Sequence, residues 1–130
     1  GFTQVTMPAS FHILEIDAGS NEAIAFQDVS VDANEVETVN DLTGYQARMQ
    51  IRRETDSTGY LVYLSTSVGG ISIVGNTGTI TIQPTVAQTM ALAPDNVDVQ
   101  HVYDLELISP TGDVIPFVWG PVKVRANATR

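Results

Sequence analysis

The amino-acid sequence predicts an all-β fold, an antiparallel β-sandwich that contains one short helix. Residues 45–52 alternate without a fault between apolar and polar side chains. Turn residues separate short apolar runs at intervals of about ten residues, and a helical pattern occurs once. Short strands at this spacing are typical of two packed antiparallel sheets.

The clearest strand covers residues 45–52. Successive residues of a strand point to opposite faces, so one face of this strand lies on a core and the other lies in water. Its apolar residues are Tyr45, Ala47, Met49 and Ile51, and its polar residues are Gln46, Arg48, Gln50 and Arg52. We therefore expect Tyr45, Met49 and Ile51 in the core.

The other strands are expected from the same signals. They are residues 11–17, 23–29, 60–66, 71–73, 79–82, 99–108, 114–119 and 122–125. A glycine-bearing turn at residues 75–78 joins two of them into a hairpin. In residues 99–108 the alternation places Leu105 and Leu107 in the core with Tyr103.

Residues 84–92 are the one expected helix, which crosses between the sheets. Thr85 can cap it, and Val86, Ala87 and Met90 share one face. Farther along, Pro116 donates no backbone hydrogen bond, which indicates an edge strand or a bulge. The pair at residues 120–121, Gly followed by Pro, predicts a break between the last two strands.

Two segments fall outside the strand pattern. Residues 1–10 have no clean period, so we expect an N-terminal arm that frays or lies along a neighbouring subunit, followed by a single domain over residues 11–130. Residues 30–41 are polar and acidic, and we expect a solvated loop with a short edge strand around Val36. This loop lacks the glycine and the spacing of a calcium-binding loop.

Composition limits the classes of function. A chain of 130 residues fits one domain, and the absence of cysteine excludes disulfides, thiolate metal sites and a cysteine nucleophile. No apolar run is long enough to span a membrane.

The net charge is −9, and eight of the fifteen acidic residues lie at or before Asp41. Acidic surfaces repel phosphate, so nucleic acid and anionic membranes are poor partners. The charge serves solubility or, alternatively, an acidic face that meets a basic partner.

The sequence does not favour catalysis, a cofactor or a metal. His12 and His101 lie on expected strands, where a structural role is more common, and nothing selects one serine as the nucleophile of a triad with His101 and Asp104. A zinc site commonly has at least three protein ligands, so the two histidines, without cysteine, would need a carboxylate to complete one. Two carboxylate pairs each share a strand face, and they are Asp104 with Glu106 and Glu15 with Asp17. Because outward strand positions commonly carry solvated acids, we expect no catalytic residue among them.

An alternative function is that of a carbohydrate-binding or adhesin module. Such a module needs an exposed aromatic platform on one face of the sandwich. The candidate residues are Tyr60, Tyr63, Phe117 and Trp119.

Several blocks of the sequence resemble small virion proteins of tailed bacteriophages. The blocks are residues 42–52, 78–81, 102–107, 110–112, 120–124 and 129–130. They are similar to the immunoglobulin-like domain at the N-terminus of phage baseplate upper proteins, and to related stand-alone proteins of phage structural gene clusters. The first 40 residues depart from that pattern through their longer acidic stretch. The resemblance implies an immunoglobulin-like sandwich that attaches to the virion and does not catalyse.

The expected function is therefore that of a bacteriophage structural protein, assembled in the host cytoplasm and mounted on the head, neck, tail, baseplate or fibre. Its expected partners are other virion proteins, in a homo-oligomeric or multi-copy assembly. We expect the contact surface in the arm and the acidic loop. The candidate residues are Phe2, Val5, Met7, Pro8, Asp32, Glu35 and Glu37.

Overall fold

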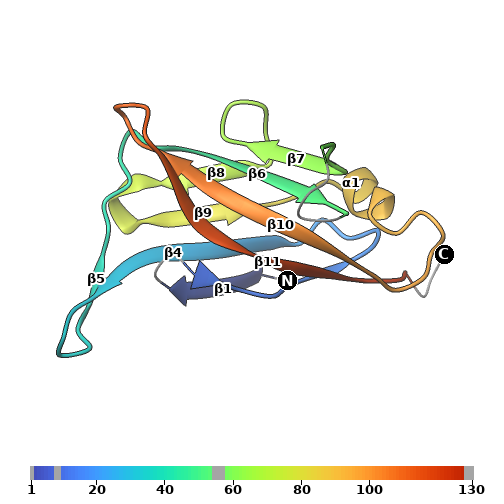
Figure 1. Ribbon diagram of the computed structural model, residues 1–130, viewed down its shortest axis with the longest axis horizontal. Helices are drawn as coiled ribbons and strands as arrows, with labels where there is room; N and C mark the ends of the chain where they lie inside the picture. The colour runs from blue at the N-terminus through green and yellow to red at the C-terminus, as the bar shows by residue number, and fades with distance from the viewer. Residues whose placement is uncertain (1, 8–9, 54–57, 128–130) are drawn as a thin grey trace.

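A computed structural model of the chain describes residues 2–7, 10–53 and 58–127, and of residues 2–7 it describes the backbone only. The described chain is mostly β-structure, arranged in two mostly antiparallel sheets with one short α-helix (Figure 1). The general prediction of a β-rich fold with a single helix is confirmed.

The first sheet, sheet A, follows the order β1-β4-β9-β8, and β5 pairs with the far part of β4. Its strands are β1 (Phe2–Met7), β4 (Ala23–Val31), β5 (Glu37–Val39), β8 (Ile71–Val74) and β9 (Thr79–Ile82). A 3-10 helix, η1 (Gly75–Thr77), lies in the turn of the predicted hairpin between β8 and β9. Only the pairing of β1 with β4 is parallel in this sheet.

The second sheet, sheet B, follows the order β2-β11-β10-β6-β7, and β3 also pairs with β11. Its strands are β2 (Ser10–Phe11), β3 (Leu14–Asp17), β6 (Gln46–Arg52), β7 (Val62–Ser65), β10 (Val99–Ile108) and β11 (Val114–Arg125). Strands β2 and β3 run parallel to β11, and the other pairs are antiparallel. The predicted strand at residues 11–17 is therefore divided in two.

Strand β6 is central, as the alternation predicts, because it pairs with β10 on one side and β7 on the other. Its inward residues Ala47, Met49 and Ile51 are buried and lie directly opposite buried partners on β10. Those partners are Leu107, Leu105 and Tyr103. Tyr45, just before the strand, is half-buried and packs against the core. The predicted core assignment is confirmed for this pair of strands.

The hydrophobic core takes side chains from both sheets. Phe26, Ile80 and Ile82 come from sheet A, and Leu105, Val118 and Val122 are examples from sheet B. The rings of Phe26 and Phe117 meet edge to face, with their centroids 6.1 Å apart. Phe117 is therefore a core residue that joins the two sheets, which suits an aromatic pair of this geometry.

Helix α1 (Val86–Ala91) connects sheet A to sheet B. The predicted cap is confirmed as a capping box, in which Thr85 Oγ1 accepts a hydrogen bond from Gln88 N and Gln88 Oε1 accepts one from Thr85 N. The face shared by Val86 and Met90 is exposed, whereas Thr89 is buried. Thr89 faces inward because its hydroxyl donates to the carbonyl of Ser20 and accepts from the backbone N–H of Gly19.

The two ends of the chain differ most from the predicted boundaries. Residues 2–7 form strand β1 of sheet A rather than an arm without secondary structure, and Pro8 lies outside the described residues. Strand β11 continues through residues 120–121, so the predicted break is absent. A Cβ on Gly120 would lie 2.5 Å from the carbonyl oxygen of His12, so this glycine permits a close approach of the neighbouring chain instead of ending the strand. Pro116 lies beside the register shift of β11, as its missing donor predicts.

Candidate functional site

Three surfaces of the molecule can be considered as functional sites. They are the hairpin formed by β4 and β5, the outer face of sheet B, and a cleft at the edge between the two sheets. The hairpin contains the acidic residues that the sequence singles out.

The β4–β5 hairpin extends away from the rest of the two sheets (Figure 1, lower left). Its turn is ordered by Asp32, whose Oδ1 accepts hydrogen bonds from the backbone N–H groups of Asn34 (2.8 Å) and Val36 (3.0 Å). Glu35 adopts a left-handed conformation with φ of 62°, and its N–H donates to the carbonyl of Asp32. The predicted loop is thus a preformed hairpin, and one carboxylate oxygen of Asp32 is used within the turn.

The base of the hairpin is held to the body of sheet A. Asn40 N donates to the carbonyl of Asp28, and Asn40 Nδ2 donates to Asp28 Oδ1 at 3.1 Å. Burial raises the pKa of Asp28, and the hydrogen bond from Asn40 acts in the opposite direction. The N–H of Asp28 in turn donates to the carbonyl of Gly78. These bonds fix the direction in which the hairpin leaves the sheet.

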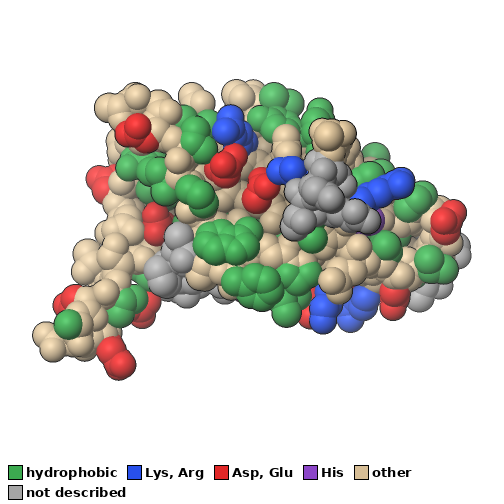
Figure 2. All heavy atoms as spheres, viewed as in Figure 1, with side chains coloured by type: hydrophobic (Ala, Val, Ile, Leu, Met, Phe, Trp, Pro, Cys, Tyr) green, Lys and Arg blue, Asp and Glu red, His purple; other side chains and the backbone are tan. Residues whose placement is uncertain are grey.

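The hairpin presents apolar side chains beside its acids. Val31 (48% exposed), Val36 (55%) and Val39 (42%) are all accessible to solvent. Val31 pairs with Glu37, and Val39 follows Glu37 by two residues. The side chains of Val31, Glu37 and Val39 therefore lie on one face of the hairpin. Figure 2 shows hydrophobic and acidic side chains together on this projection. Exposed apolar side chains with charged side chains beside them are found at protein–protein contact surfaces.

The structure brings together part of the predicted contact set. Asp32, Glu35 and Glu37 share the hairpin, whereas Phe2, Val5 and Met7 lie on β1, opposite Ala23, Phe26 and Asp28 of β4. Both groups are therefore attached to the same strand, and Met7 lies opposite the residue at the base of the hairpin. Val31, Val36 and Val39 were not named among the candidate contact residues. Their presence in a polar, acidic run was the signal that could have identified them as exposed.

The outer face of sheet B carries charged pairs and aromatic rings. Arg48 Nε donates to Glu106 Oε1 (3.0 Å), and Arg52 Nη2 donates to Asp104 Oδ2 (2.8 Å). Trp119 and Tyr60 are exposed and Tyr63 is half-exposed, but Phe117 is buried, so the predicted aromatic platform loses that member. Figure 2 shows hydrophobic side chains beside acidic and basic ones on this side of the molecule.

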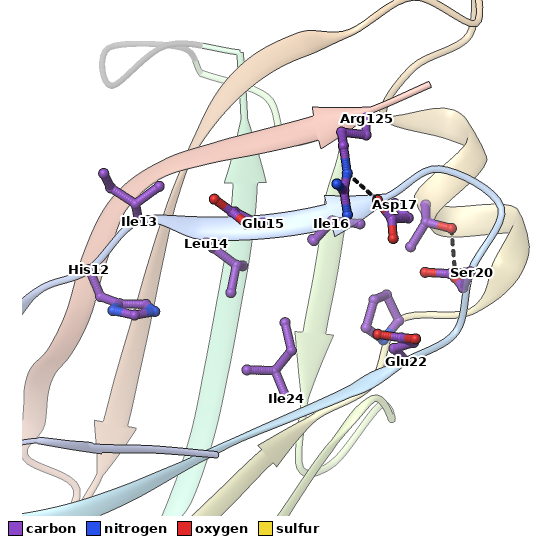
Figure 3. A pocket seen from close by; sticks show the side chains of 12 residues that line it. His12, Ile13, Leu14, Glu15, Ile16, Asp17, Ser20, Glu22, Ile24 and Arg125 are labelled. Carbon is purple, nitrogen blue, oxygen red and sulfur yellow. Dashed lines mark hydrogen bonds and ion pairs between the residues drawn. The ribbon is translucent and has the colours of Figure 1, made fainter. Parts of the chain in front are cut away.

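The third surface is a cleft of about 390 Å³ between β3 and β4. Figure 3 shows Leu14 and Ile24 directed into the gap from opposite strands, with His12 at one end and Asp17 and Ser20 at the other. Asp17 Oδ1 accepts a hydrogen bond from Arg125 Nε at 2.7 Å, and this bond raises the pKa of the Arg125 guanidinium. The middle of the cleft is therefore apolar, and its ionic groups are at its rim.

The two histidines have structural contacts, as the sequence predicts. The Nε2 of buried His101 lies 2.7 Å from the carbonyl oxygen of Leu92, so this nitrogen carries the proton and donates it. His12 packs edge to face against Phe26, with ring centroids 5.9 Å apart. His101 faces the core and Asp104 faces solvent, so these two side chains do not form part of a serine triad.

Within residues 10–53 and 58–127, no three His, Asp or Glu side chains are grouped so that they could hold a metal ion. The described helices include none that is long and apolar enough to cross a membrane. No protein-family model matches this sequence, and no curated protein matches it.

Proposed function

We propose that this protein is a non-catalytic structural module of a bacteriophage virion, mounted on the head, neck, tail, baseplate or fibre through protein–protein contacts. The observation that carries the proposal is the projecting β4–β5 hairpin, whose exposed valines and acids are preordered by the Asp32 turn. The resemblance of the later sequence blocks to phage virion proteins supports the same function.

The order of the strands supports an immunoglobulin-like sandwich. Sheet A follows β1-β4-β9-β8 and sheet B follows β11-β10-β6-β7, which correspond to the A-B-E-D and G-F-C-C′ orders of that fold. The parallel pairing of β1 with β4 departs from it, since that fold is built of antiparallel sheets. The module thus offers two packed sheets as a rigid support for the hairpin.

The hairpin fits a partner whose surface places basic side chains beside apolar ones. Burying a fully exposed valine side chain contributes about 1.5–3 kcal/mol, and each of the hairpin valines, being about half exposed, can contribute about half of that. The surrounding carboxylates of Glu35 and Glu37 steer a basic surface and reject an acidic one. Because other virion subunits are repeated, many copies of such a contact would strengthen attachment without any single tight site.

The proposal is tested by changing the valines without changing their shape. In a Val31→Thr/Val39→Thr double variant we expect at least tenfold weaker attachment to parent virions, measured by co-sedimentation, with an unchanged melting curve. Threonine keeps the β-branched shape but adds a hydroxyl that resists burial. The matched control is Val68→Thr, a change at a valine that is 76% exposed and lies outside the hairpin.

Two results would contradict the proposal at different levels. Full attachment of the double variant would remove the hairpin from the contact surface. Absence of the wild-type chain from purified parent virions, by mass spectrometry and by electron cryomicroscopy of the particle, would reject the virion function itself.

A further inference from the structure

A straight row of side chains crosses the outer face of sheet B. The strand register places Trp119 opposite Phe11 on one side and opposite Asp104 on the other, and Gln50 lies between Asp104 and Tyr63. Residues that lie directly opposite each other in neighbouring strands share a face. The row is therefore Phe11, Trp119, Asp104, Gln50 and Tyr63, on five strands, with aromatic rings at both ends and polar side chains between them.

The Phe11–Trp119 end of the row is open to a ligand, and Tyr63 at the other end is half-exposed. Trp119 is 42% exposed and Phe11 is 60% exposed. They border a shallow hollow of about 470 Å³, whose other walls include Val102, Pro121 and the Arg52–Asp104 pair. At the other end Tyr63 contacts Tyr60, with ring centroids 5.5 Å apart.

The charges in the middle of this face neutralise one another. Arg52 is paired with Asp104, and Arg48 is paired with Glu106, in a chain whose net charge is −9. The face therefore has no excess charge to attract an ion, but it keeps carboxylate and amide oxygens for hydrogen bonds. Protein interfaces are depleted of charged residues at their centres, so two ion pairs here disfavour a protein partner.

We propose that the row binds a neutral oligosaccharide that lies across the strands. A pyranose ring has an apolar C–H face that can stack on the Trp119 indole, and its hydroxyls can exchange hydrogen bonds with Asp104 and Gln50. Neighbouring strands are about 4.8 Å apart, which is close to the length that one sugar residue adds to an extended chain. Three such steps separate Trp119 from Tyr63, so a chain of about four sugars spans both aromatic ends. This site is separate from the hairpin and does not depend on its function.

Trp119 is the only tryptophan of the chain, so its fluorescence reports directly on this site. The experiment titrates the full chain with maltose, cellobiose, chitobiose and laminaribiose, and with the corresponding tetra- and hexasaccharides. We expect at least one series to change the Trp119 emission saturably. Within that series, affinity rises from the disaccharide to the tetrasaccharide and then levels off at the hexasaccharide.

Variants separate the two ends of the row. Binding in each is measured by isothermal titration calorimetry. Trp119→Ala abolishes binding of every length, and Trp119→Phe retains part of it. Tyr63→Ala weakens the tetrasaccharide at least tenfold but leaves the disaccharide unchanged, which a general loss of stability would not do. Val114→Ala, at an exposed residue of β11 outside the row, is the control.

Three results would overturn the proposal. The first is an absence of any response of Trp119 to all the sugars at millimolar concentration. The second is undiminished binding in Trp119→Ala. The third is a fluorescence change that follows protein concentration in the absence of sugar, which would make this face a contact between copies of the chain.

Discussion

The β6–β10 pair and the β4–β5 hairpin are both antiparallel pairs with apolar residues on one face, but their apolar faces have different surroundings. In β6–β10, Met49 and Leu105 lie opposite each other and are fully covered by the other sheet. In the hairpin, Val31 and Val39 lie on a common face that remains in contact with solvent.

This difference separates apolar side chains that stabilise the fold from apolar side chains that the fold leaves exposed. Apolar side chains under the opposite sheet contribute to stability through burial and close packing. The hairpin valines are left out of that core, so their burial is available to a partner. Changes in the first region should therefore unfold the protein, and changes in the second should leave it folded.

The largest expected effect tests this contrast directly. Leu105→Ala removes a fully buried side chain, and we expect the free energy of unfolding to fall by about 2–5 kcal/mol. Val31→Ala, at the exposed hairpin face, should change it by no more than about 0.5 kcal/mol. Urea denaturation of both variants measures the difference. A similar loss in both would show that the hairpin valines already belong to the folding core.

A smaller effect is expected where the hairpin joins the body. Gly78 has a φ of +61°, and a Cβ there would lie 2.5 Å from the carbonyl oxygen of Asn40. Gly112 also has a positive φ, of +91°, but has no atom within 4 Å of the same position. Gly112→Ala is therefore the matched control, which costs about 1–2 kcal/mol for the left-handed conformation alone.

We expect Gly78→Ala to lower the free energy of unfolding by more than Gly112→Ala does, because the added methyl also pushes against the base of the hairpin. Urea denaturation measures both losses. Hydrogen exchange of the Asn40 amide should also become faster in Gly78→Ala alone. Equal losses of unfolding free energy in the two variants would mean that the base of the hairpin accommodates the added methyl at no energetic cost.

The smallest expected effects concern Asp28, at the base of the hairpin, and the exposed Asp41. Burial raises the pKa of Asp28 above its ordinary value of 3.8. The stability that its carboxyl group contributes is therefore present below pH 3.8 and is lost as the pH rises through the raised pKa. The hydrogen bonds from Thr43 lower the pKa of Asp41, so its contribution is present above 3.8 and is lost as the pH falls.

Denaturation of Asp28→Asn and Asp41→Asn across a pH series on both sides of 3.8 checks these signs. Relative to wild type, Asp28→Asn should gain stability as the pH rises, whereas Asp41→Asn should lose it. A common sign in both variants would contradict the difference in environment between the base of the hairpin and the exposed Asp41.

Elements with a strong local pattern were predicted correctly. The alternation of residues 45–52 and 99–108 identified β6 and β10 with their buried faces, and the Thr85 cap located the start of α1. Strand β1 was not predicted, because its parallel pairing with β4 is a contact between distant segments that leaves no local period. The apolar residues of α1 did not identify its buried side, because Thr89 is turned inward by its bonds to Gly19 and Ser20.

The candidate surfaces were predicted only in part. The acidic residues Asp32, Glu35 and Glu37 were identified from composition, but composition did not show that they share a hairpin with three exposed valines. Likewise, Trp119, Tyr60 and Tyr63 were recognised as aromatic candidates, while Phe117 was assigned wrongly to their face. Phe117 is the extra residue at the register shift between β10 and β11, and a shift of one residue moves a side chain to the other face.

By itself, the sequence determined the β-rich class, the single helix and the inward faces of the strongly alternating strands, because side-chain periodicity is a local property of the chain. Only the tertiary structure decided which apolar residues remain exposed and which side chains from separate strands form one row. Those features depend on register and on the packing of one sheet over the other, which are relations between segments far apart in the sequence.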